Sequence, residues 1–358
     1  MHLLLKVDLP LALSTILLLI LGLTILSSVS PELLPIQITA AIIGIISFFI
    51  ISNIDYRFWI QINKPLYIFC LILLILPFIF GTAAGGSTSW LQFGQISLQP
   101  SEIVRPFILI IMAGIISHKN RSGAFSLFKS ILILIPPLIL IFKQPDLGLT
   151  ITILVGWVGI IITKGLSLKQ IIVSILIVSI ITPLSWQFLQ EYQKDRILTF
   201  IYPDKDPLNT GYQVLQSQIA VGSGQIWGRG LGRGTQSHLR FLPERHNDFI
   251  FASLAEELGL LGSLLVLTLY FIILSRFVRA LTLTQNNLGK LVIGGLLATT
   301  LFQIFVNIGM NLGLLPITGV TLPLLSYGGS SIISTFIILG LVNNLLLQSQ
   351  PASTLHIH

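Results

Sequence analysis

Long apolar runs separated by short polar segments constrain the fold of this chain more than any single motif does. A helix of roughly 20 residues is needed to cross the roughly 30 Å hydrocarbon core of a bilayer, and most of the runs approach that length. The chain is 53% hydrophobic and only 9% charged, which excludes an ordinary soluble domain and a disordered chain. The alternating pattern of a membrane β-barrel is missing, so the backbone can cross only as helices. The predicted spans are residues 9–28, 36–52, 66–80, 101–117, 127–142, 146–163, 168–188, 249–275, 288–314 and 322–347.

The chain is therefore predicted to be an all-α polytopic membrane protein with about ten transmembrane helices, forming a single integral membrane domain over residues 1–358. The first run is longer than the core of a signal peptide and lacks a small-residue cleavage site, so we expect it to stay as an anchor. Pro136 and Pro137 predict a kink in the fifth span, since proline removes a backbone donor. Cys70 is the one cysteine, so no disulfide framework exists.

Basic residues in the short loops predict the orientation, because they accumulate on the cytoplasmic side. The short loops on the opposite side offer only Lys143, with Arg105 just inside a helix. The predicted cytoplasmic side carries Lys6, Arg57, Lys64, Lys119, Arg121, Lys129, Lys164, Lys169, Arg276, Arg279 and Lys290. Both termini are therefore expected in the cytoplasm. The net charge of +7 is explained by this bias and by attraction to membrane lipids, so no nucleic-acid partner is expected.

A long polar segment, residues 189–250, separates the predicted seventh and eighth spans and is expected on the outer side. It ends in RFLPERHNDFIF, where Asp248 sits at the edge of the next apolar run. A carboxylate at a membrane boundary is costly and is therefore a functional candidate. We expect the segment to be partly re-entrant, folded back against the helices.

The other polar groups in or beside the spans gather at the same predicted outer side. They are Glu102, Arg105, Asp146, Glu256, Glu257, Asn307, Asn311 and the segment Ser326–Ser331. A transporter would be expected to carry polar groups through the midplane for alternating access. The one-sided arrangement favours chemistry on a lipid-linked substrate in the outer leaflet, with a transporter as the alternative.

Sequence blocks that cover nearly all of the chain from Gly81 to Ser331 carry a family resemblance. The blocks are GGSTSWLQFGQISLQPSEIVR, KQPDLGLT, GYQVLQSQIAVGSGQIWGRGLGRGTQ, FLPERHNDFIFASLAEELG and NIGMNLGLLPITGVTLPLLSYGGSS. In this order they resemble the SEDS family (shape, elongation, division and sporulation), and the short segment before the first span is closer to its RodA type than to FtsW. The resemblance implies a peptidoglycan glycosyltransferase of the bacterial cytoplasmic membrane. Such an enzyme polymerises lipid II, an undecaprenyl diphosphate-linked glycan, beside a class B penicillin-binding protein that crosslinks the product.

Polymerisation requires a sugar hydroxyl to attack an anomeric carbon while the diphosphate leaves. The family reaction converts an α linkage into a β linkage, so it needs one base for the hydroxyl proton and a positive environment for the diphosphate. The resemblance maps the family's essential loop aspartate onto Asp248, the candidate base. The structural alternative for Asp248 is a helix N-cap. At the level of the whole protein, a lipid II flippase and a non-catalytic scaffold for the penicillin-binding protein remain alternatives.

Glu102 and Arg105 lie three residues apart and can pair on one helical turn. They are either a structural ion pair or electrostatic support for Asp248 beside the sugar diphosphate. The family pattern has Lys where Arg105 stands, and its Arg-Trp pair is replaced by Ser89-Trp90. Trp90 would stack on a sugar or anchor at the interface.

The remaining candidates for substrate binding each have a structural alternative. Asp146 would either cap the sixth span or join the outer site, and His246 would either relay a proton or simply pack. Gln216 fits the lining of a re-entrant loop, and Ser326 belongs to a locally weakened helix entry. The candidate diphosphate partners, which could equally be snorkelling anchors, are Lys143, Arg196, Arg229, Arg233 and Arg245.

The glycines of GSGQIWGRGLGRG do not follow a strand of a soluble α/β unit, so they predict tight turns of a re-entrant loop rather than a nucleotide site. No pair of histidines has metal-ligand spacing. No cofactor is predicted with certainty. A divalent cation such as Mg²⁺ or Mn²⁺ bridging the diphosphate stays open, because substrate oxygens plus one or two carboxylates suffice to bind it.

Overall fold

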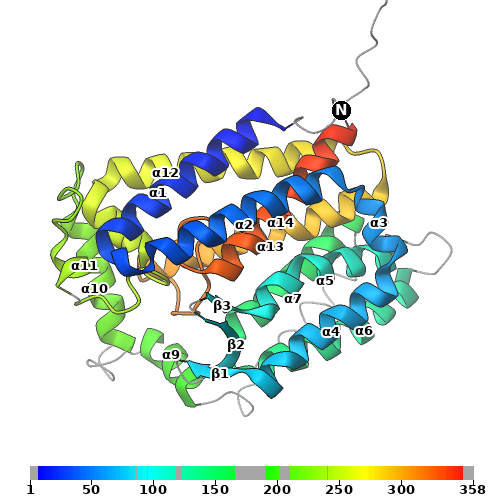
Figure 1. Cartoon of the computed structure of the whole chain (residues 1–358), viewed down its shortest axis with the longest axis horizontal. Helices are drawn as coiled ribbons and strands as arrows, with labels where there is room; N and C mark the ends of the chain where they lie inside the picture. The colour runs from blue at the N-terminus through cyan, green and yellow to red at the C-terminus, as the bar shows by residue number, and fades with distance from the viewer. Residues whose placement is uncertain are drawn as a thin grey trace, which may run out of the picture.

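The computed structural model describes residues 7–84, 87–94, 96–117, 123–165, 191–201, 210–239 and 241–349. Over these ranges, 9 helices are long and apolar enough to cross a membrane. Each overlaps one of the predicted spans, and the predicted seventh span, 168–188, lies outside the described residues. The all-α polytopic class is confirmed (Figure 1).

The spanning helices are α1 (Leu9–Val29), α2 (Leu34–Asn53), α4 (Asn63–Phe80), α5 (Pro100–Ser117), α6 (Gly123–Lys143), α7 (Leu147–Lys164), α12 (Ile250–Leu283), α13 (Asn287–Asn311) and α14 (Gly329–Ser349). The shorter elements are η1 (Pro31–Leu33), α3 (Tyr56–Gln61), α9 (Glu191–Ile201), α10 (Thr210–Ser223) and α11 (Thr235–His238). Helix α6 runs on through Pro136 and Pro137.

Helices α5 and α14 form the centre of the bundle, with 83% and 89% of their spanning windows buried, whereas the figure for α4 is 22%. The outer helices keep apolar faces exposed, as expected where lipid replaces water as solvent. Helix α7 approaches α13 closely through glycine, since a Cβ on Gly159 would lie 2.7 Å from the Gly294 carbonyl oxygen. Small residues at such crossings let membrane helices pack tightly.

The start of α1 and the ends of α12 and α14 meet at one end of the bundle. The Asp8 amide donates to Asn343 Oδ1 over 2.9 Å, and Arg276 Nε donates to Asp8 Oδ1 over 2.8 Å. Figure 1 shows α9, α10, α11 and the strands at the opposite end. The start of α1 and the end of α14 therefore lie at the same end of the bundle. The cytoplasmic location of this end remains a prediction.

A three-stranded antiparallel sheet joins α4 to α5, which the sequence analysis did not predict. Its strands are β1 (Thr82–Ala84), β2 (Ser87–Phe93) and β3 (Ile96–Leu98), in the order β1-β2-β3. Trp90 on β2 pairs with Thr82 on β1. Strands β1 and β3, with 3 residues each, are too short to be recognised from sequence, and β2, which reads STSWLQF, does not alternate regularly between polar and apolar residues.

Helix α12 is broken at Gly259, whose φ of 65° and ψ of −161° are not helical. The freed backbone groups are paired by the glycine turn, residues 225–233: Arg229 N donates to Glu256 O over 2.9 Å, and Leu260 N donates to Gln225 O over 2.8 Å. The predicted eighth span, 249–275, is thus corrected. It comprises a short half-helix, Ile250–Leu258, and a spanning segment from Leu260 to Leu283.

The predicted tenth span, 322–347, also begins later than expected, at Gly329. Residues 322–328 form a loop instead, and Leu324 within it has a φ of 68°, outside helical geometry. Ser326 Oγ accepts a hydrogen bond from Leu322 N over 2.8 Å and donates one to Asn247 O over 2.8 Å. The prediction of helix for residues 322–328 was therefore wrong, because the hydroxyl group of Ser326 bonds the backbone of this loop.

We expect Gly228→Ala to lower the melting temperature of the detergent-solubilised protein. Gly228 has a φ of +78°, and a Cβ there would lie 2.1 Å from the Glu257 carbonyl oxygen. Backbone strain alone costs roughly 1–3 kcal/mol, and the clash adds to it. The matched control is Gly222→Ala on α10, where nothing lies within 4 Å and alanine favours the helix. An equal effect of both variants would contradict this account of the turn.

Candidate active site

Asp248 lies directly before α12 and is 8% exposed. The N-cap residue of α12 is Phe249, without a side-chain cap bond, and Asp248 Oδ1 has no hydrogen-bond partner. The N-cap interpretation of Asp248 is therefore wrong. A buried carboxylate oxygen without a partner is unfavourable for stability, and Glu102 Oε2 and Glu257 Oε2 are in the same state.

Two asparagines on α13 hold the main chain of Asp248. Its carbonyl oxygen accepts hydrogen bonds from Asn307 Nδ2 over 3.1 Å and from Asn311 Nδ2 over 2.9 Å. Asn307 Nδ2 also donates to Val320 O over 2.8 Å, and Asn311 Oδ1 accepts from Ala252 N over 2.9 Å. The pair fixes the backbone at Asp248 and leaves its side chain unbonded to either.

Arg196 on α9 faces the same small space as Asp248. A Cβ on Gly319 would lie 3.6 Å from Arg196 Nη1 and 4.0 Å from Asp248 Oδ2, so glycine leaves room between the two charges. Burial raises the pKa of Asp248 to about 6, the Arg196 charge opposes that rise, and Glu244 adds to it. The structure thus brings together Asp248 and Arg196, two of the residues selected from the sequence.

Glu102 and Arg105 form a second, buried cluster with α14. Arg105 Nη1 lies 3.2 Å from Glu102 Oε2, and Arg105 Nη2 donates to Ser334 Oγ over 3.2 Å. The Glu102–Arg105 contact has the distance of an ion pair but not the alignment of a hydrogen bond, so the attraction between the two side chains is electrostatic. Because the Arg105 side chain is fully buried, this geometry favours a structural ion pair over direct contact with substrate.

Asp146 belongs to this second cluster and also caps α7. Its Oδ1 accepts from Leu149 N over 2.9 Å, and its Oδ2 accepts from Gln99 Nε2 over 2.6 Å. Burial raises the pKa of Asp146 to about 6, Glu102 adds to the rise, and Arg105 opposes it. The two roles considered for Asp146, helix cap and member of a polar cluster, are thus compatible.

The loop at residues 318–320 separates the two carboxyl clusters. A Cβ on Gly148, at the start of α7, would lie 2.7 Å from Thr318 O. Gly319 faces Asp248 from the same loop. Asp146 and Asp248 therefore lie at the same end of the bundle, on either side of this short segment.

Three other candidates contribute to the scaffold around Asp248. Arg245 donates to Val29 O from Nε and Nη2 over 3.3 and 3.2 Å, and Ser326 is held in the loop bonds described above. The His246 carbonyl accepts from Tyr327 N over 2.9 Å, and the His246 and Tyr327 rings meet edge to face. Burial lowers the pKa of His246, with Arg245 adding to the effect, which favours a neutral imidazole.

The described contacts do not join Lys143, Trp90 or Gln216 to Asp248. Lys143 is exposed at the end of α6, Trp90 is half-buried on β2, and Gln216 is half-buried on α10. The neighbour of Gln216, Ser217, donates to Asn311 O over 2.8 Å, which places α10 against the end of α13. Among the residues that the structure describes, no group of three or more His, Cys, Asp or Glu side chains could hold a metal ion.

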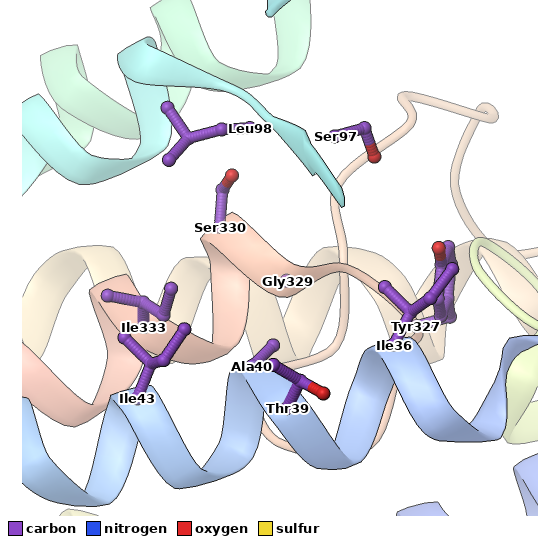
Figure 2. Close-up of a pocket in the computed structure, with 10 residues that line it drawn as sticks. All are labelled: Ile36, Thr39, Ala40, Ile43, Ser97, Leu98, Tyr327, Gly329, Ser330 and Ile333. Atoms are coloured by element: carbon purple, nitrogen blue, oxygen red, sulfur yellow. The ribbon is translucent and has the colours of Figure 1, made fainter. Parts of the chain in front are cut away.

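A groove opens beside the site between α2, β3 and the start of α14 (Figure 2). Figure 2 shows the hydroxyl side chains of Ser330 and Tyr327 on either side of Gly329. The Tyr327 amide bonds the His246 carbonyl, so the groove adjoins the segment that carries Asp248. The lining consists of Ile36, Thr39, Ala40, Ile43, Ser97, Leu98, Tyr327, Gly329, Ser330 and Ile333.

Sequence reasoning missed the groove and several supporting residues. On α2 the groove residues resemble ordinary lipid-facing positions, and Gly319, Gln99 and Ser334 belong to no pattern of their own. Asn307 and Asn311 did carry a signal, since two carboxamides one turn apart within an apolar run need partners. Their partner, the Asp248 carbonyl, could not be identified without the tertiary structure.

Comparisons with known proteins agree with this architecture. The model of the FtsW/RodA/SpoVE cell cycle protein family matches residues 6–350. The chain is 40% identical over 292 residues to the peptidoglycan glycosyltransferase MrdB of Escherichia coli K12, covering 81% of this chain and 79% of that protein. It is 35% identical over 313 residues to stage V sporulation protein E of Bacillus subtilis 168, covering 86% and 85%.

Solved structures share the fold over almost the whole chain. A chain from a peptidoglycan synthase complex superposes with a TM-score of 0.83 at 29% identity, covering 97% of this chain and 100% of that one. The rod shape determining protein RodA of Thermus thermophilus gives a TM-score of 0.72 at 26% identity, covering 97% and 99%. The predicted resemblance to the SEDS family is thus confirmed. From its helical architecture, its sequence blocks and these matches, the chain belongs to the FtsW/RodA/SpoVE family.

Proposed function

We propose that this protein is a peptidoglycan glycosyltransferase that polymerises lipid II at the outer face of the bacterial cytoplasmic membrane. The observation that carries the proposal is Asp248, a buried carboxylate with an unpaired oxygen at the end of the bundle. Relatives at 40% and 36% identity are named as an established and a probable peptidoglycan glycosyltransferase. Both termini would then lie in the cytoplasm, opposite the site.

In the proposed reaction Asp248 is the general base. A sugar hydroxyl of the acceptor attacks the anomeric carbon of the donor, and Asp248 takes the proton of that hydroxyl. The bond from the anomeric carbon to the diphosphate breaks, and undecaprenyl diphosphate leaves with the electron pair. Attack opposite the leaving group inverts the configuration, so a single base is sufficient.

Among the described residues, Arg196 is the cation that we place beside the departing diphosphate. It faces Asp248 across Gly319, and a fixed positive charge near the developing negative charge lowers the barrier. Glu102, Arg105 and Asp146 lie on the other side of the 318–320 loop. They would influence the reaction indirectly, by fixing the position of this loop and by the electrostatic field of their charges. Substrate contacts by Trp90, Lys143, Gln216, Arg245, His246 and Ser326 remain proposals.

The surface around the groove is where we place the lipid part of such a substrate, because the groove itself, with a volume of about 20 Å³, holds little more than a water molecule. Its walls on α2 and α14 are mainly apolar, and it carries hydroxyl groups where it adjoins the Asp248 segment. A polyprenyl tail would lie along the apolar part while the sugars reach Asp248. If a divalent cation accompanies the diphosphate, the substrate oxygens would supply most of its ligands, because the described residues offer no group of three His, Cys, Asp or Glu side chains for it.

We further propose a class B penicillin-binding protein as the partner. The structural neighbour with a TM-score of 0.83 belongs to a peptidoglycan synthase complex that coordinates polymerization and crosslinking. A polymerase that releases uncrosslinked glycan strands benefits from a transpeptidase held beside it. The similarity in fold supports the same kind of assembly here.

A lipid II flippase is the competing function. Alternating access needs polar groups along the whole path through the membrane. In the described residues, the carboxylates other than the Asp8 and Asp55 caps gather toward the end that carries Asp248. Chain growth in detergent, where translocation has no meaning, distinguishes the two functions.

We expect Asp248→Asn to reduce lipid II polymerisation by about 10²-fold or more, since a positioned base contributes roughly 10²–10⁴-fold. The measurement is glycan chain length from labelled lipid II with the purified protein and its cognate transpeptidase. The melting temperature should be unchanged or higher, because the Asp248 side chain caps no helix. Asp195→Asn, at an exposed position on α9, is the matched control. Full activity of Asp248→Asn would refute the proposed base.

We expect activity to fall as the pH drops through about 6, because Asp248 accepts a proton only when ionised and its pKa is raised to about 6 by burial. Arg196 lowers this pKa, so Arg196→Gln should move the inflection to higher pH. Asp146→Asn should leave it in place, although the pKa of Asp146 is also raised to about 6. Initial rates between pH 5 and 8 on the three proteins test this. If the inflection disappeared in Asp146→Asn, the titrating group would be Asp146, and the assignment to Asp248 would be wrong.

A further inference from the structure

An exposed apolar surface lies where the glycine turn meets the break in α12. Trp227 is 80% exposed, and Ile226 beside it is also exposed. On α12, Leu260, Leu261 and Leu264 are exposed as well. Leu260 N donates to Gln225 O over 2.8 Å and Leu261 N to Ile226 O over 3.3 Å, so the two segments are fixed side by side. These five apolar residues are called the Trp227 patch below.

The break places this patch at the boundary of the bilayer. The segment from Leu260 to Leu283 has a length of about 36 Å at roughly 1.5 Å per residue, slightly more than the roughly 30 Å hydrocarbon core. Leu260 therefore marks one end of the membrane-spanning part. Tryptophan is enriched at this depth, where its ring is in contact with both apolar and polar surroundings.

The charges in the turn match a lipid surface. Residues 225–233 read QIWGRGLGR, with two basic residues and no acidic one. Arg229 and Arg233 are both exposed, and basic side chains beside a membrane are attracted to anionic headgroups. The patch is also continuous with further exposed leucines of α12, and the basic turn beside it favours anionic lipid as its occupant.

We propose that residues 225–233 are an interfacial membrane anchor. Ile226 and Trp227 insert among the headgroups at this end of the bundle, and the exposed Arg233 contacts lipid phosphates, whereas Arg229 Nη1 donates to Thr235 Oγ1 over 3.0 Å. Neither the polymerase proposal nor the family assignment includes this surface.

The anchor is rigidly connected to the half-helix that begins after Asp248. Gly230 N donates to Glu257 O over 3.0 Å, close to the Arg229–Glu256 bond already described. The Glu256 carboxylate accepts from Gln236 N over 2.8 Å and from Ser237 N over 3.0 Å. The depth of the turn in the membrane thus sets the height of Asp248 above the hydrocarbon core, a consequence that rests on the proposed function.

Fluorescence quenching in nanodiscs tests the anchor without using activity. The single cysteine is replaced by Cys70→Ala, and Ile226→Cys or Trp227→Cys is labelled with an environment-sensitive maleimide dye. Nanodiscs contain phosphatidylcholine, phosphatidylglycerol and a lipid with a shallow doxyl quencher. Leu267→Cys, at an exposed position farther along α12, provides the reference within the bilayer, and Asp195→Cys, at an exposed position on α9, provides the aqueous reference. We expect several-fold stronger quenching at positions 226 and 227 than at position 195.

Charge recognition is tested in the same samples. Omitting phosphatidylglycerol should weaken the quenching at position 226, and Arg233→Gln should reduce this dependence on anionic lipid. Quenching at positions 226 and 227 no stronger than at position 195 would overturn the anchor. Protection of these positions from an aqueous thiol reagent only after adding the cognate transpeptidase would also overturn it, since the patch would then be a protein-docking surface.

The link to Asp248 has its own readout. Trp227→Ser should lower lipid II polymerisation in nanodiscs while leaving the melting temperature in detergent unchanged, because the ring contacts lipid rather than the fold. Gln225→Ser in the same turn is the control. Full activity of Trp227→Ser in nanodiscs would refute the depth-setting role, and the quenching experiment decides the anchor independently.

Discussion

Backbone hydrogen bonding at membrane depth is the constraint on which this structure depends. A helix that breaks near a bilayer exposes carbonyl and amide groups that lipid cannot satisfy. At Gly259 the backbone amides and carbonyl oxygens of residues 225–230 in the glycine turn supply the missing hydrogen-bond partners. Because those bonds replace the helical ones, α12 can end its spanning part at Leu260 and still continue as a short half-helix. That half-helix begins two residues after Asp248.

The same rule explains how a carboxylate is held in a mainly apolar bundle. Asn307 and Asn311 donate hydrogen bonds to the Asp248 carbonyl oxygen, so Asp248 is held in place through its backbone rather than its side chain. The side chain keeps one oxygen unbonded, which costs stability and preserves basicity. Burial raises the pKa of Asp248 to about 6, so the group is a stronger base than a solvated aspartate and is still ionised at neutral pH. A base of this kind matches proton transfer near the working pH.

Particular residues show why some of the site was predictable. Asp248, Glu102 and Asp146 were recognisable because charges are rare in apolar sequences and therefore conspicuous. Arg245 was selected as a basic residue at the outer interface and Ser326 as part of a weakened helix entry, yet they bond the backbone at Val29 and Asn247. A polar side chain at a membrane boundary has the same sequence signature whether it serves substrate or scaffold. Only its partners distinguish the two roles.

The sequence by itself determined the helical class, the approximate position of nine spans and the family, because apolar run length and characteristic sequence blocks are local properties. The tertiary structure decided the break at Gly259, the loop at residues 322–328, the small sheet and the position of Arg196 near Asp248 across Gly319. These features depend on hydrogen bonds and close approaches between residues far apart in the chain. No local pattern encodes such partners, and the geometry around Asp248 consists almost entirely of them.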